Sequence, residues 1–288
     1  MVLPVVLKAI NPLDWDLGNV PPGIPWGGVD EAGRGAWAGP VVAACAVLDP
    51  AAVHRWSHVL RAARDSKQLS PERRESIAGE LKLVLAAWAV AEVDNLAIDR
   101  DNILQATLQA MRRCVAQVDP RPRILFVDGD RAPRTGLPER LLVEGDATSC
   151  AVAAASILAK THRDARMREL DEACPGYGFA RHKGYGTQAH RKALQELGAS
   201  PVHRLSYAPV VALQRPDARV LEDLTSSLEA CASVTGLQAW AEASLRPAYG
   251  QLKPGWVEDL RCAYAERLVR FAQAEPGEAV RDDAPPLE

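Results

Sequence analysis

An adjacent acidic pair, Asp30 and Glu31, runs directly into a Gly-Arg-Gly turn at residues 33–35. The pair follows the apolar start of an expected strand, so two carboxylates stand at a strand end, where oxygen ligands for a hard divalent cation could gather. Glycines on either side of Arg34 would let backbone N–H groups come close to a sugar-phosphate chain. The segment therefore indicates metal-dependent phosphodiester chemistry, although an acidic pair beside a glycine-rich turn is more often a solvated loop.

Two further acids stand at the ends of expected elements. Asp128 closes the apolar run 124–127, and Asp146 follows Gly145 just before an alanine-rich segment. Taken singly, they are explained as a turn residue and a helix cap. Taken with Asp30 and Glu31, four acids at one sheet edge would repel one another unless cations held them. Two metal ions would relieve that repulsion and could serve an in-line phosphoryl displacement.

The acidic pair imposes a geometric condition. Successive strand residues face opposite sides of a sheet, so Asp30 and Glu31 can share one metal cluster only if the strand ends, bends or bulges there. The glycine turn that follows the pair makes this arrangement feasible.

Apolar, β-branched runs alternate with helical periodicity from residue 26 onward, which predicts an α/β layer fold with a mixed sheet. We expect strands near residues 26–31, 39–48, 83–93, 123–128 and 140–144. Helices are expected over 53–64, from a Ser70 cap, from an Asp101 cap to about residue 118, from a Thr148 or Ser149 cap to about residue 170, and after Thr187.

The chain divides by composition into four parts. Residues 1–25 form a lead, and 26–214 form the α/β domain. Leucine-rich helical spacing over 215–274 predicts a helical appendage, and the acidic, proline-bearing end 275–288 is expected to be disordered.

Composition describes an ordinary globular protein of 288 residues, 48% hydrophobic and 25% charged. No apolar run reaches the roughly 18 residues that span a bilayer, and the start makes a poor signal peptide. We therefore expect a cytoplasmic protein with no membrane partner. The six cysteines lack zinc-site spacing and are expected to be free thiols.

The net charge of −3 argues at first against a nucleic-acid partner. The charge is unevenly distributed, however: residues 1–214 carry 26 Lys and Arg against 24 Asp and Glu, whereas 215–288 carry 8 against 13. The main body is mildly basic, and metal bound to its acids would make its field more positive, as phosphate contacts require.

At this point the chain resembles the bacterial ribonuclease HII family over roughly residues 26–209. The matching motifs are Gly-Val-Asp-Glu-Ala-Gly-Arg-Gly at 28–35, Gly-Pro-Val-Val at 39–42, Asp-Ser-Lys at 65–67, Asn-Ile-Leu-Gln-Ala-Thr at 102–107, Val-Asp-Gly at 127–129, Gly-Asp at 145–146, Ala-Ala-Ala-Ser-Ile-Leu-Ala-Lys at 153–160, Arg-Asp at 163–164 and His-Lys-Gly-Tyr-Gly-Thr at 182–187. The resemblance implies an RNase H-like mixed sheet flanked by helices, here with a C-terminal helical extension.

The resemblance also implies an activity. Asp30, Glu31, Asp128 and Asp146 would be the catalytic and metal-binding acids of a site for two Mg²⁺ or Mn²⁺ ions. The enzyme would cleave the RNA strand of an RNA–DNA hybrid and nick 5′ to a single ribonucleotide embedded in duplex DNA. The products would carry 3′-hydroxyl and 5′-phosphate ends.

The resemblance gives the substrate-reading roles to two short segments. Gly33, Arg34 and Gly35 would read the ribose 2′-hydroxyl, and Tyr185 would pack on the adjoining deoxyribose. A 2′-hydroxyl is both donor and acceptor, so close backbone groups can detect it without reading the base.

Other residues are weaker candidates for substrate contact. Lys67 could reach a backbone phosphate or be a solvated loop lysine, and His182 and Lys183 belong to a basic segment expected to face nucleic acid. Glu144 stands where the family commonly has lysine, and Asp130 adds negative charge near Asp128.

Two alternatives stay open at the level of sequence. The chain could be a non-catalytic hybrid-binding module, a possibility suggested by Glu144 and the acidic appendage. It could also be a ribonuclease HIII-type enzyme, although the short lead leaves no room for the extra N-terminal domain of that type. The sequence gives no protein partner for the C-terminal helices.

Overall fold

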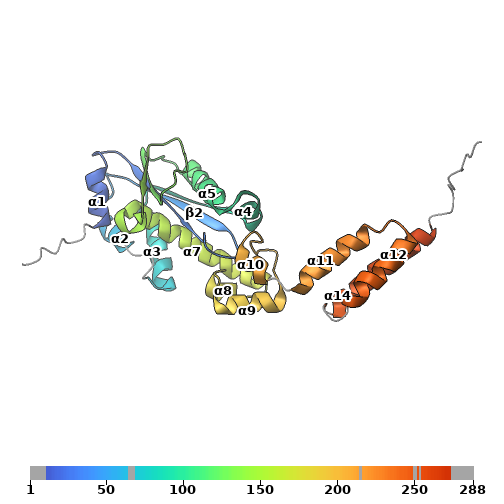
Figure 1. Ribbon diagram of the computed structural model, residues 1–288. Helices are drawn as coiled ribbons and strands as arrows, with labels where there is room; N and C mark the ends of the chain where they lie inside the picture. Colours follow the sequence, from blue (N-terminus) through green and yellow to red (C-terminus); the bar gives the residue numbers. More distant parts are fainter. Residues whose placement is uncertain (1–10, 64–68, 214–215, 249–251, 253, 274–288) are drawn as a thin grey trace, which may run out of the picture. The chain divides into compact units, whose positions relative to one another are not determined.

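The computed structural model describes residues 11–63, 69–213, 216–248, 252 and 254–273. The chain forms two compact units, Met1–Leu213 and Gln214–Glu288, and each is considered by itself (Figure 1).

The first unit is built on a five-stranded sheet. Its strands are β1 (Trp26–Ala32), β2 (Val41–Leu48), β3 (Ala87–Val93), β4 (Ile124–Asp128) and β5 (Glu139–Leu142). They lie in the order β3-β2-β1-β4-β5; β1 pairs antiparallel with β2 and parallel with β4. The prediction of a mixed sheet is therefore confirmed.

Both faces of the sheet are covered by helices. Alternate residues of β2 enter two different cores, as the period of two in a strand requires. Val42 and Ala44 pack in the core that contains α7 (Cys150–Ala173) and α3 (Pro71–Val84). Val41 and Ala43 pack in the core that contains α5 (Ile103–Gln117). Helices α5 and α7 accordingly lie on opposite sides of β2 in Figure 1.

Helix α7 lies close to β1, an approach that its small alanine side chains permit. A Cβ atom at Gly28 would overlap the main-chain atoms of Ala151 and Val152. The alanines at 151, 153, 154, 155 and 159 are all buried. This close contact holds the start of α7 against the strand that carries Asp30 and Glu31.

Side-chain caps start several helices where the sequence predicts them. Ser70 accepts a hydrogen bond from the Arg73 N–H at the start of α3, and Thr187 caps α9 (Gln188–Leu197). Of the two candidates for α7, Ser149 is the cap; Thr148 instead ends the short helix α6 (Gly145–Thr148).

The prediction that Asp101 caps α5 is wrong. Asn102 caps it, accepting a hydrogen bond from the Gln105 N–H, and Asp101 is the last residue of another helix, α4 (Asn95–Asp101). Asn102 separates the two helices with φ 69° and ψ 162°, a conformation outside the helical region.

The remaining helices of this unit are short. The helix expected over 53–64 is present only as α2 (Ser57–Ala62). The others are α1 (Pro12–Asn19), α8 (Phe179–His182) and α10 (Ala208–Leu213).

The second unit is helical, which confirms the predicted C-terminal extension. It contains α11 (Pro216–Glu229), α12 (Val234–Trp240), a π-helical turn (Ala241–Leu245), α13 (Arg246–Ala248) and α14 (Pro254–Gln273). These helices share their own apolar core, with Leu228, Leu237 and Leu260 at its centre. The expected disordered tail, 275–288, lies outside the described residues.

Over the described ranges, no helix is long and apolar enough to cross a membrane. All six cysteines are free thiols, as their spacing predicts.

Candidate active site

Three carboxylates meet at one edge of the sheet. One oxygen each from Asp30, Glu31 and Asp128 lies within 4.8 Å of the others, close enough to hold a metal ion. Parallel pairing of β1 with β4 ends at Val29 and Val127, so Asp30 and Asp128 come directly after the last paired residues and Glu31 one residue later. Pairing of β1 with β2 continues in register to Ala32, so the strand neither ends nor bulges at Asp30 and Glu31 on that side, contrary to two of the possibilities raised by the sequence; only the pairing with β4 stops before them, at Val29.

The electrostatics of this carboxylate trio favour a bound cation. Asp30 is only 4% exposed, and burial, together with the nearby charges of Glu31 and Asp128, raises its pKa well above the ordinary value. Burial likewise raises the pKa of Glu31. A hydrogen bond from Ser156 on α7 and one from the Glu31 N–H, at 2.7 Å, partly offset this cost at Asp30. A divalent ion would offset it further.

The fourth predicted acid lies on the wall of the same cavity. The Gly145 N–H donates to Asp128 Oδ1 at 2.7 Å, and this contact fixes the start of α6, whose first turn carries Asp146. Asp146 lines a cavity of about 570 Å³ with the trio, but it is not one of the three that approach within ligand distance. The structure thus brings three of the four acids into one cluster and places the fourth beside it.

The Gly-Arg-Gly turn forms another wall, and a buried arginine holds it in place. Arg204 donates to the carbonyl oxygens of Gly33 (2.8 Å), Arg34 (3.0 Å) and Gly39 (3.0 Å). The Arg34 guanidinium lies 3.6 Å from Glu31, so the turn also places one positive charge beside the trio.

A second buried arginine joins this turn to the segment that carries Tyr185. Arg163 donates to Pro40 O (3.0 Å) and Ala38 O (3.2 Å) on one side and to Lys183 O (2.9 Å) on the other. Its guanidinium carbon lies 5.5 Å from the Tyr185 ring centroid. Tyr185 is 43% exposed and lines the cavity. Arg163 therefore links the segment that follows the Gly-Arg-Gly turn to the segment that precedes Tyr185.

The weaker candidates for substrate contact differ in their placement. Lys183 lines the cavity, with its Nζ donating to Ala180 O at 2.7 Å. His182 is not among the lining residues: its Nε2 lies 2.8 Å from Tyr177 O, and its ring stacks on His190 with centroids 4.4 Å apart. Lys67 lies outside the described residues.

Glu144 and Asp130, the two acids that differ from the charge pattern expected of the family, are not among the residues that line the cavity. Glu144 is exposed and precedes α6 in a left-handed conformation. Asp130 is exposed and lies 3.8 Å from Arg131. Neither acid lines the cavity that contains the trio.

Five polar residues that line this cavity were given no role in the site by sequence reasoning: Arg74, Ser156, Lys160, Arg163 and Asp164. Arg74 is buried and pairs with Asp164 at 3.0 Å. A signal for three of them exists, because Ser156, Lys160 and Asp164 recur at intervals of four on α7 and so share one helix face.

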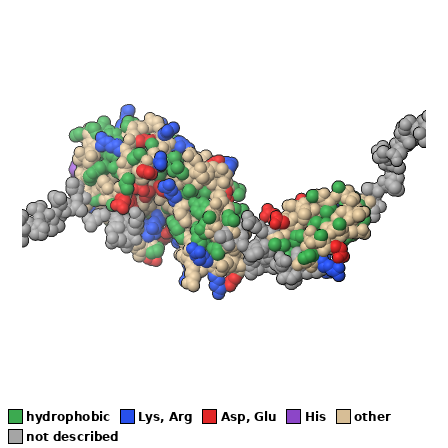
Figure 2. All heavy atoms as spheres, in the orientation of Figure 1, with side chains coloured by type: hydrophobic (Ala, Val, Ile, Leu, Met, Phe, Trp, Pro, Cys, Tyr) green, Lys and Arg blue, Asp and Glu red, His purple; other side chains and the backbone are tan. Residues whose placement is uncertain are grey.

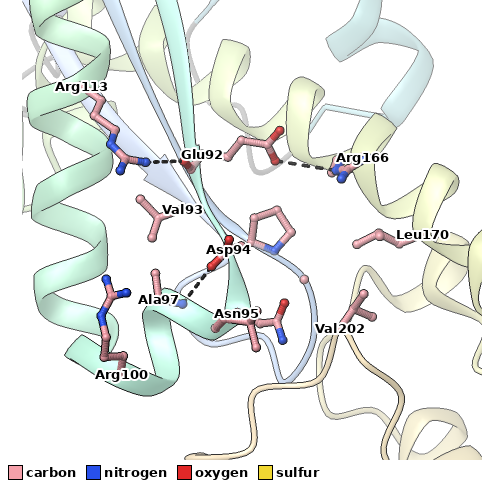
Figure 3. Close-up of a pocket in the computed structure, with 13 residues that line it drawn as sticks. Glu92, Val93, Asp94, Asn95, Ala97, Arg100, Arg113, Arg166, Leu170 and Val202 are labelled. Carbon is pink, nitrogen blue, oxygen red and sulfur yellow. Dashed lines mark hydrogen bonds and ion pairs between the residues drawn. The ribbon is translucent and has the colours of Figure 1, made fainter.

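A second pocket, of about 620 Å³, lacks such a carboxylate cluster (Figure 3). Its three arginines are already engaged: Arg113 donates to Glu92 O (3.3 Å), Arg166 lies 3.8 Å from the Glu92 carboxylate, and Arg100 pairs with Asp101 (2.7 Å). On the face drawn in Figure 2, acidic and basic side chains of the first unit are interspersed rather than gathered in one large patch. The carboxylate cavity is therefore the candidate active site.

Comparison with known proteins identifies the family. The family model for ribonuclease HII matches residues 27–210. The chain belongs to the ribonuclease HII family. It is 50% identical over 199 residues to ribonuclease HII of Thiobacillus denitrificans, covering 69% of this chain and 91% of that protein. It is 52% identical over 190 residues to ribonuclease HII of Halorhodospira halophila, covering 64% and 93%.

Solved structures agree with this assignment. Ribonuclease H2 of Pyrococcus horikoshii superposes with a TM-score of 0.56 at 25% identity, covering 66% of this chain and 97% of that one. Ribonuclease HII in the PCNA complex from Archaeoglobus fulgidus gives 0.55 at 28% identity, covering 65% and 96%. The fold is RNase H-like, and family membership supports a ribonuclease H endonuclease.

Proposed function

We propose that this enzyme is a metal-dependent endoribonuclease that cleaves the RNA strand of RNA–DNA hybrids and nicks 5′ to single ribonucleotides in duplex DNA. It would leave 3′-hydroxyl and 5′-phosphate ends. The observation that carries the proposal is the carboxylate trio in a cavity whose walls include the Gly-Arg-Gly turn and Tyr185.

The donor set fits a hard divalent cation. Asp30, Glu31 and Asp128 offer carboxylate oxygens, which Mg²⁺ and Mn²⁺ prefer, and Asp146 lines the same cavity. When bound, two such ions supply water activation and stabilisation of the leaving oxygen. A structural neighbour at 20% identity and TM-score 0.52, the Bst ribonuclease HIII, was solved with Mn²⁺.

The other walls of the cavity suit a ribose followed by a deoxyribose. The Gly33–Gly35 turn presents main-chain groups that can hydrogen-bond a 2′-hydroxyl, and the exposed Tyr185 ring presents a flat face that a sugar without that hydroxyl can approach. Selectivity for the junction requires both parts of the cavity.

Cleavage of a labelled DNA duplex with one embedded ribonucleotide tests the proposal. With Mg²⁺ or Mn²⁺ the full-length protein should produce a single nick 5′ to the ribonucleotide. Asp128→Asn should lower the rate by at least about a hundredfold, because it removes a charged ligand from the trio.

Asp130→Asn is the matched control. It makes the same chemical change two residues away, at an exposed carboxylate that does not line the cavity, and should leave the rate within about twofold. Junction-specific binding without cleavage in either metal would instead identify a non-catalytic hybrid-binding module.

A further inference from the structure

Beneath the exposed Tyr185 lie two fully buried histidines. His190 and His203 are each 0% exposed. His190 Nδ1 lies 3.0 Å from Tyr185 O, and His190 Nε2 lies 3.0 Å from His203 Nε2. His203 Nδ1 in turn lies 2.9 Å from the Ser200 backbone nitrogen and 2.8 Å from the Ser200 hydroxyl oxygen. The four groups form one continuous hydrogen-bonded chain.

The chain has a direction that the backbone groups at its two ends dictate. The Ser200 N–H can only donate, so His203 Nδ1 accepts and the His203 proton resides on Nε2. That proton is donated to His190 Nε2, which leaves the His190 proton on Nδ1. His190 Nδ1–H then donates to the Tyr185 carbonyl oxygen, which can only accept.

Both imidazoles are neutral in this arrangement. Burial lowers the pKa of His190 and of His203 to about 4, so neither ring is charged at neutral pH. The titratable group stacked against His190 is His182, which also lowers the pKa of both rings. The hydrogen bonds can all run in one direction only if both rings are neutral, because a charged imidazole donates from both nitrogens and cannot accept.

The hydrogen-bonded series ends at the main chain of Tyr185, whose ring is partly exposed and lies against the Arg163 guanidinium. Tyr185 is 43% exposed, so the direction of its ring depends strongly on its backbone. Its N–H donates to His182 O at 2.9 Å, and its carbonyl accepts from the Thr187 N–H at 2.8 Å as well as from His190. Of these partners, only His190 reaches Tyr185 through a side chain.

We propose that His190, oriented by His203, is a positioning residue that sets the main chain of Tyr185 and thereby the selectivity for the RNA–DNA junction. This inference rests on the proposed function, in which the Tyr185 ring packs on the deoxyribose. His190 does not touch the substrate in this account; it acts through Tyr185 alone.

Two substitutions in the full-length protein distinguish the contributions of the two ring nitrogens of His190. His190→Asn places an amide near the Nδ1 position and can still donate to Tyr185 O, whereas His190→Gln places it near Nε2 and keeps only the contact with His203. We expect His190→Gln to lower kcat/KM on the single-ribonucleotide duplex by about tenfold, and His190→Asn by no more than about threefold, the scale of one hydrogen bond. Equal losses in the two variants would overturn the proposal.

The same substitutions in a Tyr185→Ala background distinguish positioning from general structural support. If His190 acts through Tyr185, His190→Gln should cost less than about twofold once the ring is gone. An undiminished loss in that background would overturn the proposal. Failure of the wild-type protein to nick would instead refute the proposed function. This outcome is distinct from failure of the positioning proposal, which requires an active wild-type protein.

A measurement on the wild-type protein tests the proposal even if the His190 variants do not fold. Imidazole ¹⁵N chemical shifts of the full chain at pH 7 should show His190 protonated on Nδ1 and His203 on Nε2. Protonation of His190 on Nε2, or on both nitrogens, would contradict the proposed direction of the hydrogen bonds from Ser200 to Tyr185.

Discussion

The two glycines of the Gly-Arg-Gly turn have different structural needs. Gly33 adopts φ +88°, and a Cβ there would overlap the Arg163 side chain. Gly35 has no heavy atom within 4 Å of an added Cβ and an ordinary φ. The fold therefore requires glycine at position 33. At position 35 the fold would tolerate a side chain, so glycine there would matter only for the approach of substrate.

This difference gives a prediction for Gly35→Ala. The substitution should leave the free energy of unfolding within about 0.5 kcal/mol of wild type but reduce nicking of the single-ribonucleotide duplex by about tenfold or more, because a methyl group would block close approach of the sugar-phosphate chain. Urea unfolding and the nicking assay measure the two effects.

Gly33→Ala serves as the comparison and should destabilise the fold by about 2 kcal/mol or more. Full nicking activity in a stable Gly35→Ala protein would show that the substrate does not approach this backbone.

At the scale of elements, the contact between β1 and α7 positions the site. Gly28 in β1 meets the main chain of α7, and Ser156, further along α7, reaches Asp30 at the end of β1. A wider separation of the two elements would withdraw Ser156 from the trio.

Gly28→Ala should therefore lower the free energy of unfolding by about 3 kcal/mol or more, since backbone atoms cannot move aside as a flexible side chain can. Gly18→Ala in α1 is the control: nothing lies within 4 Å of the added Cβ, and the protein should be unchanged or slightly more stable. Thermal unfolding of the two variants measures the difference, and equal stability would contradict the close packing.

Much of this arrangement could be predicted from sequence, because it depends on local patterns. Strand alternation and the caps at Ser70 and Thr187 follow from residue type and spacing. The boundary at Asp101 was wrong because Asp101 and Asn102 are both good cap residues by type; in the structure Asp101 still belongs to α4, and the Asn102 side chain accepts from the Gln105 N–H.

The site shows where sequence reasoning stops. The acids at strand ends were found because strand ends converge at one sheet edge. His182 ends the one-turn helix α8, and the direction of its ring is set by tertiary contacts, so the sequence could not show that it stacks on His190 rather than lining the cavity. The histidine chain joins residues whose contact only the fold creates.

At the scale of the whole molecule, the first unit contains the sheet, both of its cores and the candidate active site. The second unit has a separate apolar core. We therefore propose that the first unit carries the nuclease activity by itself.

A chain that stops after Leu213 should keep its thermal unfolding midpoint within a few degrees and its nicking rate within about threefold of the full-length protein. Assays of the two chains side by side test this expectation. A large loss of kcat/KM in a stably folded truncated protein would show that the C-terminal helices contribute to substrate binding.

The central claim is that Asp30, Glu31 and Asp128 hold divalent ions at the end of β1. Anomalous diffraction from Mn²⁺-soaked crystals tests this claim most directly. We predict a manganese peak about 2.1 Å from oxygens of at least two of the three carboxylates. Crystals in which Mn²⁺ binds only elsewhere, with the three carboxylates free of metal, would contradict the account.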